Sequence, residues 1–183
     1  MVISRPTVYA GCTFRSRLEA NWAAFFDLMG WKWSYEPMDF NGWVPDFVLI
    51  GKKQRIFVEV KPYFSQEEFV SNEVIEKVTR AMNVDDQNEI LLLGVDVDLE
   101  KSYFEDAVVL GWLIDFTMDT GRAILLTTGG FCHDSNSYHD RISGFYDGGH
   151  VSEMPKDEAI EKFNEAKSIV QWSGNNWRRD FLK

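Results

Sequence analysis

The chain has 183 residues, 45% hydrophobic and 15% aromatic, a composition that excludes disordered and fibrous proteins and predicts one globular domain over residues 1–183. The net charge of −10 opposes nucleic-acid binding, because Lys and Arg bind phosphates. The charge is uneven: residues 1–62 hold eight basic and six acidic residues (+2), and residues 63–183 hold eleven and twenty-three (−12). No leader-like segment opens the chain, and no apolar run approaches the roughly 18 residues of a membrane span. We therefore expect a soluble, cytoplasmic protein with no membrane partner, in which Cys12 and Cys132 are reduced thiols.

The first half of the chain predicts a helix followed by three strands. A helix is expected from about Ser16 to Met29, where apolar residues recur at helical spacing and a glycine follows. Residues 31–36 alternate between aromatic and polar side chains, which indicates a half-buried strand. Two further apolar-rich runs, 43–50 and 55–61, surround "GKKQ" and predict a hairpin.

The second half begins with a second helix, predicted from about Gln66 to Met82 by its apolar stripe, its acidic first turn and a capping serine. Residues 89–97 form a continuous apolar run, typical of a strand buried on both faces. Two further strands are expected in the segments "AVVLGWLIDF" and "RAILLTT". Residues 129–150 predict a long loop or a short-stranded excursion, and a last helix is expected from about Lys156 to Val170.

The hairpin carries charged residues where a strand would usually bury apolar ones. With the strand period of two, Arg55, Phe57, Glu59 and Lys61 share one face. Asp46, on the other strand, also lies between apolar neighbours, so both acids are expected to lose much of their water. Burying two unpaired carboxylates is costly, and a divalent cation such as Mg²⁺ would offset that cost.

These residues resemble a known family, the PD-(D/E)XK nuclease superfamily. Its signature is matched by "PD" at 45–46 and "EVK" at 59–61, and the upstream "FRSRLEA" at 14–20 and "YEP" at 35–37 are similar to the start of phage-type endonuclease I and related nucleases of phages and mobile elements. The resemblance implies an α/β fold with a restriction-endonuclease-like core over about residues 13–97. That core has a helix, a three-stranded antiparallel meander, a helix and a strand, in a central mixed sheet flanked by helices. Residues 98–183 would be C-terminal additions.

The resemblance also implies an activity, that of a metal-dependent DNA endonuclease hydrolysing phosphodiester bonds. Asp46 and Glu59 would hold Mg²⁺ or Mn²⁺, helped by Glu19 on the first helix and the backbone carbonyl of Val60. Lys61 would complete the catalytic set by orienting the attacking water or stabilising negative charge on the phosphoryl group. Nearby carboxylates raise the pKa of a lysine, so we favour positioning over proton abstraction.

Other interpretations of the same residues stay open. Ser16 and Glu19 stand in the S-x-x-E relation of a capping box, so Glu19 would then only close the helix start. Asp46 after a proline is also typical of a turn, and Glu59 with Lys61 of a solvated edge strand.

Basic and metal-binding side chains elsewhere suggest further sites. Candidate phosphate contacts are Arg15, Arg17, Lys52 and Lys53. Cys132, His133, His139 and His150 invite a zinc interpretation, but their spacing fits no common structural zinc pattern.

The substrate and partners follow from the same evidence. The resemblance suggests DNA, branched or otherwise structured, and a homodimer with two sites related by a two-fold axis. The alternative is an interaction or regulatory protein with a nuclease fold, whose acidic surface, richest between about Glu67 and Asp119, binds a protein partner; that surface is otherwise a solvated face. An RNA substrate is a third interpretation.

Overall fold

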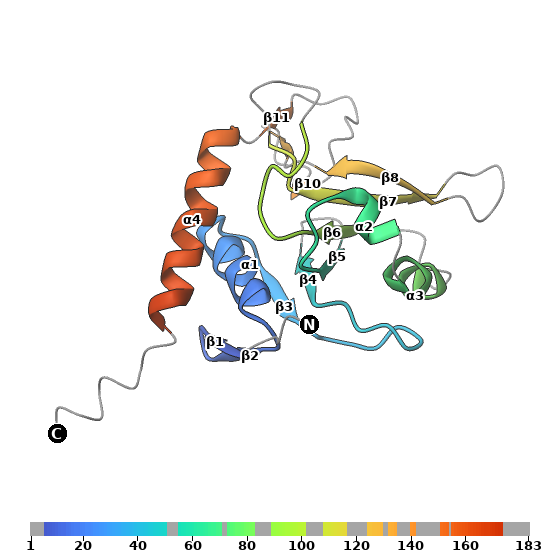
Figure 1. Cartoon of the computed structure of the whole chain (residues 1–183), viewed down its shortest axis with the longest axis horizontal. Coiled ribbons are helices and arrows are strands. Elements are labelled where there is room, and N and C mark those ends of the chain that lie inside the picture. Colours follow the sequence, from blue (N-terminus) through green and yellow to red (C-terminus); the bar gives the residue numbers. More distant parts are fainter. Residues whose placement is uncertain are drawn as a thin grey trace.

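The structure is a computed structural model, and it describes residues 6–50, 55–70, 73–82, 89–101, 108–116, 124–129, 132–134, 140–141, 151–153 and 155–173. Its main element is a six-stranded sheet with the strand order β3-β4-β5-β6-β7-β8 (Figure 1). The strands are β3 (Trp33–Tyr35), β4 (Phe47–Ile50), β5 (Arg55–Val60), β6 (Glu89–Leu93), β7 (Gly111–Phe116) and β8 (Ile124–Gly129). The helices in the described part of the chain are α1 (Arg17–Leu28), α2 (Gln66–Val70), α3 (Glu73–Met82) and α4 (Lys156–Ser173).

The sheet is mixed. Strands β3, β4 and β5 form an antiparallel meander, and β6 then pairs with β5 in parallel. A parallel neighbour requires a crossover connection, which the segment containing α2 and α3 provides. Strands β7 and β8 extend the sheet with antiparallel pairing. The predicted α/β order of helix, three strands, helix and strand is thereby confirmed, except that the single helix expected over 66–82 is two helices, α2 and α3.

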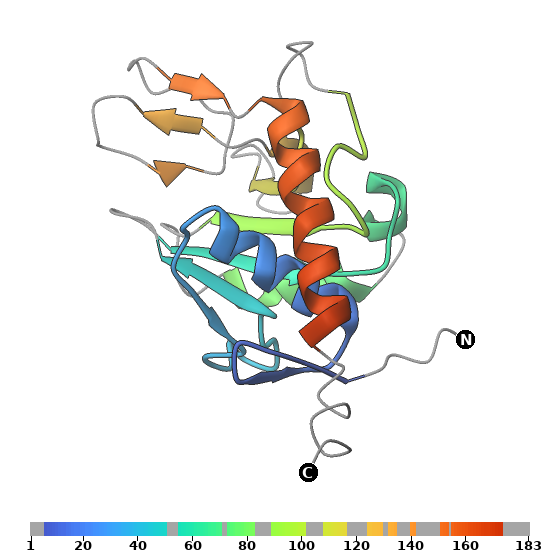
Figure 2. The same ribbon diagram turned by 90° about the vertical axis from the view of Figure 1, so that its left-hand side faces the viewer.

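Helices cover both faces of the sheet (Figures 1 and 2). On one face, Ile56, Val58 and Val60 of β5 belong to a core cluster with residues of α1 and α4. On the other face, Phe57 packs in a second cluster with Phe69 of α2 and with residues of α3. The division of β5 into two faces confirms the predicted alternation, and it assigns Glu59 to the face of Phe57.

Two smaller sheets lie outside the main one. Strands β1 (Thr7–Tyr9) and β2 (Cys12–Phe14) form a hairpin that the sequence did not predict, and Cys12 is a free thiol. Strands β9 (Cys132–Asp134), β10 (Asp140–Arg141) and β11 (Val151–Glu153) form the other sheet (Figure 2). Short strands within 129–150 agree with the predicted short-stranded excursion.

The element boundaries differ from the prediction in the meander. Strand β3 is shorter than the predicted 31–36, and β4 begins at Phe47 rather than at Trp43. Trp43 instead forms an isolated bridge with Phe40, in the segment between β3 and β4. None of the described helices is long and apolar enough to cross a membrane.

Candidate active site

The two acids of the predicted hairpin lie beside each other where β4 begins and β5 ends. The antiparallel register pairs Phe47 with Val58, which brings Asp46 next to Glu59. Both side chains are buried, with exposed fractions of 1% for Asp46 and 8% for Glu59. The N–H of Val60 donates to Asp46 Oδ2 at 2.7 Å, so the backbone of β5 holds the Asp46 carboxylate. The predicted loss of water is confirmed, and the alternative of a solvated Glu59 is wrong.

Lys61 joins the two acids electrostatically. Its Nζ donates to Glu59 Oε1 at 2.5 Å and to the carbonyl of Val60 at 3.2 Å, and it lies 3.8 Å from Asp46 Oδ2. Burial lowers the pKa of Lys61, but the charges of Glu59 and Asp46 outweigh that effect and leave the pKa raised. Lys61 is therefore a fixed cation, and the expectation that carboxylates would raise its pKa is confirmed.

Arg15 brings a second cation to Asp46. Its guanidinium donates to Asp46 Oδ1 at 2.5 Å and also contacts Glu36 Oε1 at 2.7 Å. Glu36 has a left-handed φ of 42°, a conformation that non-glycine residues seldom adopt, and its N–H donates to the carbonyl of Asp46 at 3.0 Å. The chain following β3 is thus bent so that the Glu36 carboxylate lies within reach of Arg15.

Glu19 is both a helix cap and a neighbour of the site. Ser16 is the N-cap of α1, its Oγ accepting from the Glu19 N–H at 3.1 Å and donating to Glu19 Oε1 at 2.7 Å. The other oxygen, Oε2, accepts from the Tyr35 hydroxyl at 2.6 Å and from the Arg15 N–H at 3.1 Å. Glu19 is 7% exposed, and its charge is one cause that raises the pKa of Asp46. Glu19 therefore takes part in the cap of α1 and also acts electrostatically on Asp46.

The site holds more negative charge than its cations neutralise. Burial raises the pKa of Asp46 from its ordinary 3.8 to about 6, with the Glu59 charge as the next largest cause. The Lys61 charge and the Val60 N–H lower the pKa of Asp46 but do not cancel this effect. Two buried carboxylates this close disfavour each other's ionisation, and an additional cation would relieve that repulsion.

The donor chemistry fits Mg²⁺ or Mn²⁺, which prefer carboxylate and carbonyl oxygens. Within the residues that the structure describes, no group of three His, Cys, Asp or Glu side chains is arranged to hold a metal ion. Arg15 instead donates to Asp46 Oδ1, and Lys61 donates to Glu59 Oε1. The Arg15 side chain is 59% exposed and has Glu36 as another partner, so it can leave Asp46 and remain paired. Asp46 and Glu59 supply carboxylate oxygens of the kind that a divalent cation takes, and binding one would require these hydrogen bonds to be exchanged.

The remaining predicted residues have different outcomes. Arg17 lies exposed in the first turn of α1, and no contact joins it to the acids within the described residues. Lys52 and Lys53 lie outside the described residues, as do His139 and His150. For Cys132 and His133 only the backbone, in β9, is described, so the structure does not test the zinc interpretation, which the spacing did not support.

The site contains side chains that sequence reasoning missed. The Tyr35 hydroxyl donates to Glu19. The pKa of Tyr35 is raised, mainly because the side chain is partly buried and secondly because of this hydrogen bond. Trp43 donates its indole N–H to Glu59 Oε2 at 2.9 Å. The dipeptide Asn41-Gly42 just before Trp43 was a turn signal that could have separated this tryptophan from β4.

No family model, curated protein or solved structure matches the chain.

Proposed function

We propose that the protein is a metal-dependent endonuclease with a PD-(D/E)XK active site. The observation that carries this proposal is the pair of buried carboxylates, Asp46 and Glu59, both contacted by Lys61 where β5 ends. The two buried acids share the cations Lys61 and Arg15, and burial together with the Glu59 charge still keeps the pKa of Asp46 raised. Perturbed ionisable groups of this kind are concentrated at functional sites.

The fold supports the proposal at the level of topology. An antiparallel meander is followed by a crossover and a parallel strand; Asp46 directly precedes the second strand of that meander, and Glu59 lies on the third. Glu19 approaches from the first helix of this order. We propose that α1 to β6 is the restriction-endonuclease-like core and that the chain after β6 is an addition to it.

Asp46 and Glu59 would hold Mg²⁺ or Mn²⁺, with the Val60 carbonyl and Glu19 as further oxygen donors. When bound, such an ion polarises a phosphoryl oxygen and lowers the pKa of a coordinated water. The Val60 N–H fixes the orientation of the Asp46 carboxylate, and the Trp43 N–H fixes one oxygen of Glu59. Because these donors already hold the two carboxylates, the carboxylates need to reorient less during the reaction.

Lys61 and Arg15 act on the phosphodiester directly. The raised pKa of Lys61 keeps its ammonium charged, so it donates hydrogen bonds to the attacking water or to the phosphoryl oxygens as their negative charge grows. Arg15 is more exposed than Lys61 and carries a planar guanidinium suited to phosphate oxygens. If a phosphate replaced Asp46 as the hydrogen-bond partner of Arg15, the guanidinium would hold the scissile strand.

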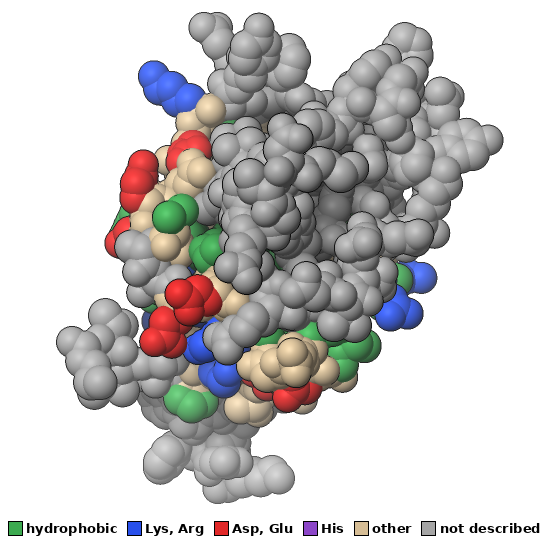
Figure 3. Space-filling model, turned by 90° about the vertical axis from the view of Figure 1, so that its right-hand side faces the viewer, with side chains coloured by type: hydrophobic (Ala, Val, Ile, Leu, Met, Phe, Trp, Pro, Cys, Tyr) green, Lys and Arg blue, Asp and Glu red, His purple; other side chains and the backbone are tan. Residues whose placement is uncertain are grey.

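DNA is the proposed substrate, with branched or structured DNA as the favoured form and a homodimer as the favoured assembly. The binding of a protein partner through an acidic surface is the alternative. On the face in Figure 3, the described side chains include both acidic and basic ones, with several acidic side chains along the left of the view.

A cleavage assay tests the proposal. Supercoiled, linear, single-stranded and four-way-junction DNA, with a matched RNA, are incubated with the parent, Glu59→Ala and Lys61→Ala in Mg²⁺ or Mn²⁺. Lys32→Ala, an exposed lysine on β3's flank, is the control for loss of a positive charge. We expect the parent and Lys32→Ala to cut at least one DNA and the two site variants to be inactive. Equal inactivity of all four proteins on every substrate and metal would refute the nuclease proposal.

A further inference from the structure

We propose that Trp43 is a positioning residue for Glu59, an inference that depends on the proposed function of the site. The Trp43 indole N–H donates to Glu59 Oε2 at 2.9 Å, and this hydrogen bond is buried. The other oxygen, Oε1, is the one that Lys61 contacts. Trp43 therefore holds one Glu59 oxygen in place, and the other oxygen is held by Lys61.

A tight turn fixes the backbone of Trp43. Phe40 and Trp43 exchange two backbone hydrogen bonds, of 2.7 and 3.1 Å. The two residues between them, Asn41 and Gly42, have φ values of 52° and 92°, the pattern of a type I′ turn, which favours the sequence Asn-Gly. Asp39 Oδ1 accepts from the Gly42 N–H at 2.7 Å and reinforces the turn. The local sequence thus fixes the backbone position from which the Trp43 side chain extends.

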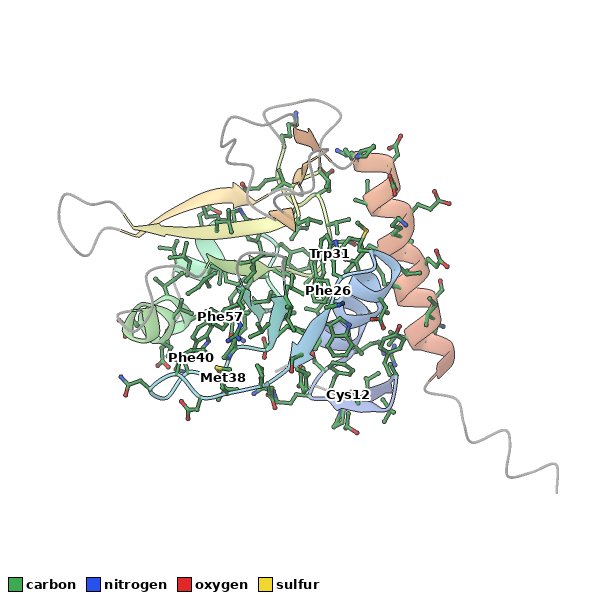
Figure 4. All side chains as sticks on the ribbon, turned by 180° about the vertical axis from the view of Figure 1, so that it is seen from behind. Cys12, Phe26, Trp31, Met38, Phe40 and Phe57 are labelled. Carbon is green, nitrogen blue, oxygen red and sulfur yellow. The ribbon has the colours of Figure 1, made fainter. Side chains whose placement is uncertain are left out.

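Aromatic packing fixes the ring itself. The Trp43 ring lies 6.1 Å from that of Phe40 and 6.2 Å from that of Phe57, and the latter two are 4.7 Å apart in an edge-on arrangement. Figure 4 shows Phe40 and Phe57 close together on the side of the sheet away from Phe26 and Trp31. Trp43 is only 5% exposed, so water cannot replace Glu59 as the acceptor without opening this packing.

The energetic consequence concerns the metal affinity of the site. A buried indole N–H without an acceptor is unfavourable, so Trp43 and Glu59 constrain each other's conformations. Partners that orient a metal-binding carboxylate typically change metal affinity or activity by roughly 10- to 100-fold when removed. Losing only the indole N–H should therefore weaken Mn²⁺ binding by at least about tenfold while the ring packing is retained.

The test measures Mn²⁺ binding by isothermal titration calorimetry, without substrate, for the parent and Trp43→Phe. Trp33→Phe is the matched control, because the Trp33 indole N–H donates at 2.8 Å to a carboxylate oxygen of Asp27, outside the site. We expect Trp43→Phe to raise the Kd at least tenfold and Trp33→Phe to leave it within about twofold of the parent. Benzothienylalanine at position 43 keeps the size of the ring without the N–H, and it should reproduce the Trp43→Phe result even if the phenylalanine variant folds poorly.

The outcomes separate this inference from the proposed function. If the parent binds Mn²⁺, Glu59→Ala does not, and both position-43 variants bind as the parent does, the role of Trp43 is refuted while the metal site stands. If the parent binds no Mn²⁺, both proposals fail. An equal loss in the Trp33 and Trp43 variants would assign the effect to general destabilisation and refute positioning.

Discussion

The raised pKa of Asp46 should make the metal-free protein less stable as the pH rises. A folded-state pKa of about 6, against 3.8 for the ordinary group, means that the folded protein binds this proton more tightly than the unfolded chain does. The resulting stability is fully present below about pH 4 and is lost as the pH rises to about 6. Above about pH 6 both states are ionised and Asp46 makes no further contribution to the slope.

The magnitude follows from the size of the shift. Each pKa unit corresponds to about 1.4 kcal/mol, so a shift of roughly two units gives at most about 3 kcal/mol. The assay is urea unfolding of the parent and Asp46→Asn, without metal, at several values between about pH 4 and pH 7. The free energy of unfolding of the parent should fall by up to about 3 kcal/mol relative to the variant across this range. Only the change with pH is used, so any effect of the substitution that does not depend on pH cancels.

Glu59→Gln adds a second arm to this experiment. The Glu59 charge is the second-largest cause of the raised pKa of Asp46, so removing it should lower that pKa and reduce the pH-dependent loss. A difference between the parent and Asp46→Asn that stays constant with pH, or that favours the parent as the pH rises, would contradict the described electrostatics.

Three further predictions test the site and the fold. Mg²⁺ at about a hundredfold excess over its Kd should stabilise the parent by about 2.7 kcal/mol in thermal unfolding, and Glu59→Ala should abolish this gain. Ser16→Ala should lower the free energy of unfolding in urea by about 1 kcal/mol, because α1 loses its N-cap. The control Ser168→Ala removes a hydroxyl that donates within α4 and should cost less. Equal losses in the two variants would argue against the cap. Gly111→Ala should cost roughly 1–3 kcal/mol or more, because a Cβ there would lie 2.2 Å from a backbone oxygen of β6; unchanged stability in the same assay would contradict the β6–β7 pairing.

Periodicity predicted the elements that bury continuous apolar faces. The alternation of Ile56, Val58 and Val60 was sufficient to place β5, because each of these side chains contacts the same helical layer. The helix at 66–82 was predicted as one element because apolar residues recur at helical spacing through the sequence of both α2 and α3. The hairpin of β1 and β2 was missed because its three-residue strands are too short to show a period.

The charged residues of the site were predictable, and their hydrogen-bond donors were not. Asp46, Glu59 and Lys61 stand out because they interrupt apolar strands. Trp43 and Tyr35 are aromatic residues in an aromatic-rich chain, so composition assigns them to the core. Only the three-dimensional packing shows that each directs an N–H or O–H toward a carboxylate.

The most direct test of the metal-dependent nuclease site is the rate at which the parent and Glu59→Gln nick a supercoiled plasmid as Mg²⁺ is titrated. Glu59→Gln keeps the size of the side chain and removes its charge. We expect nicking by the parent to rise with Mg²⁺ and to stop on chelation, and the variant to be at least about a hundredfold slower, in line with the loss of a metal ligand. Nicking by Glu59→Gln at the parent rate, or nicking that persists after chelation, would contradict the assignment.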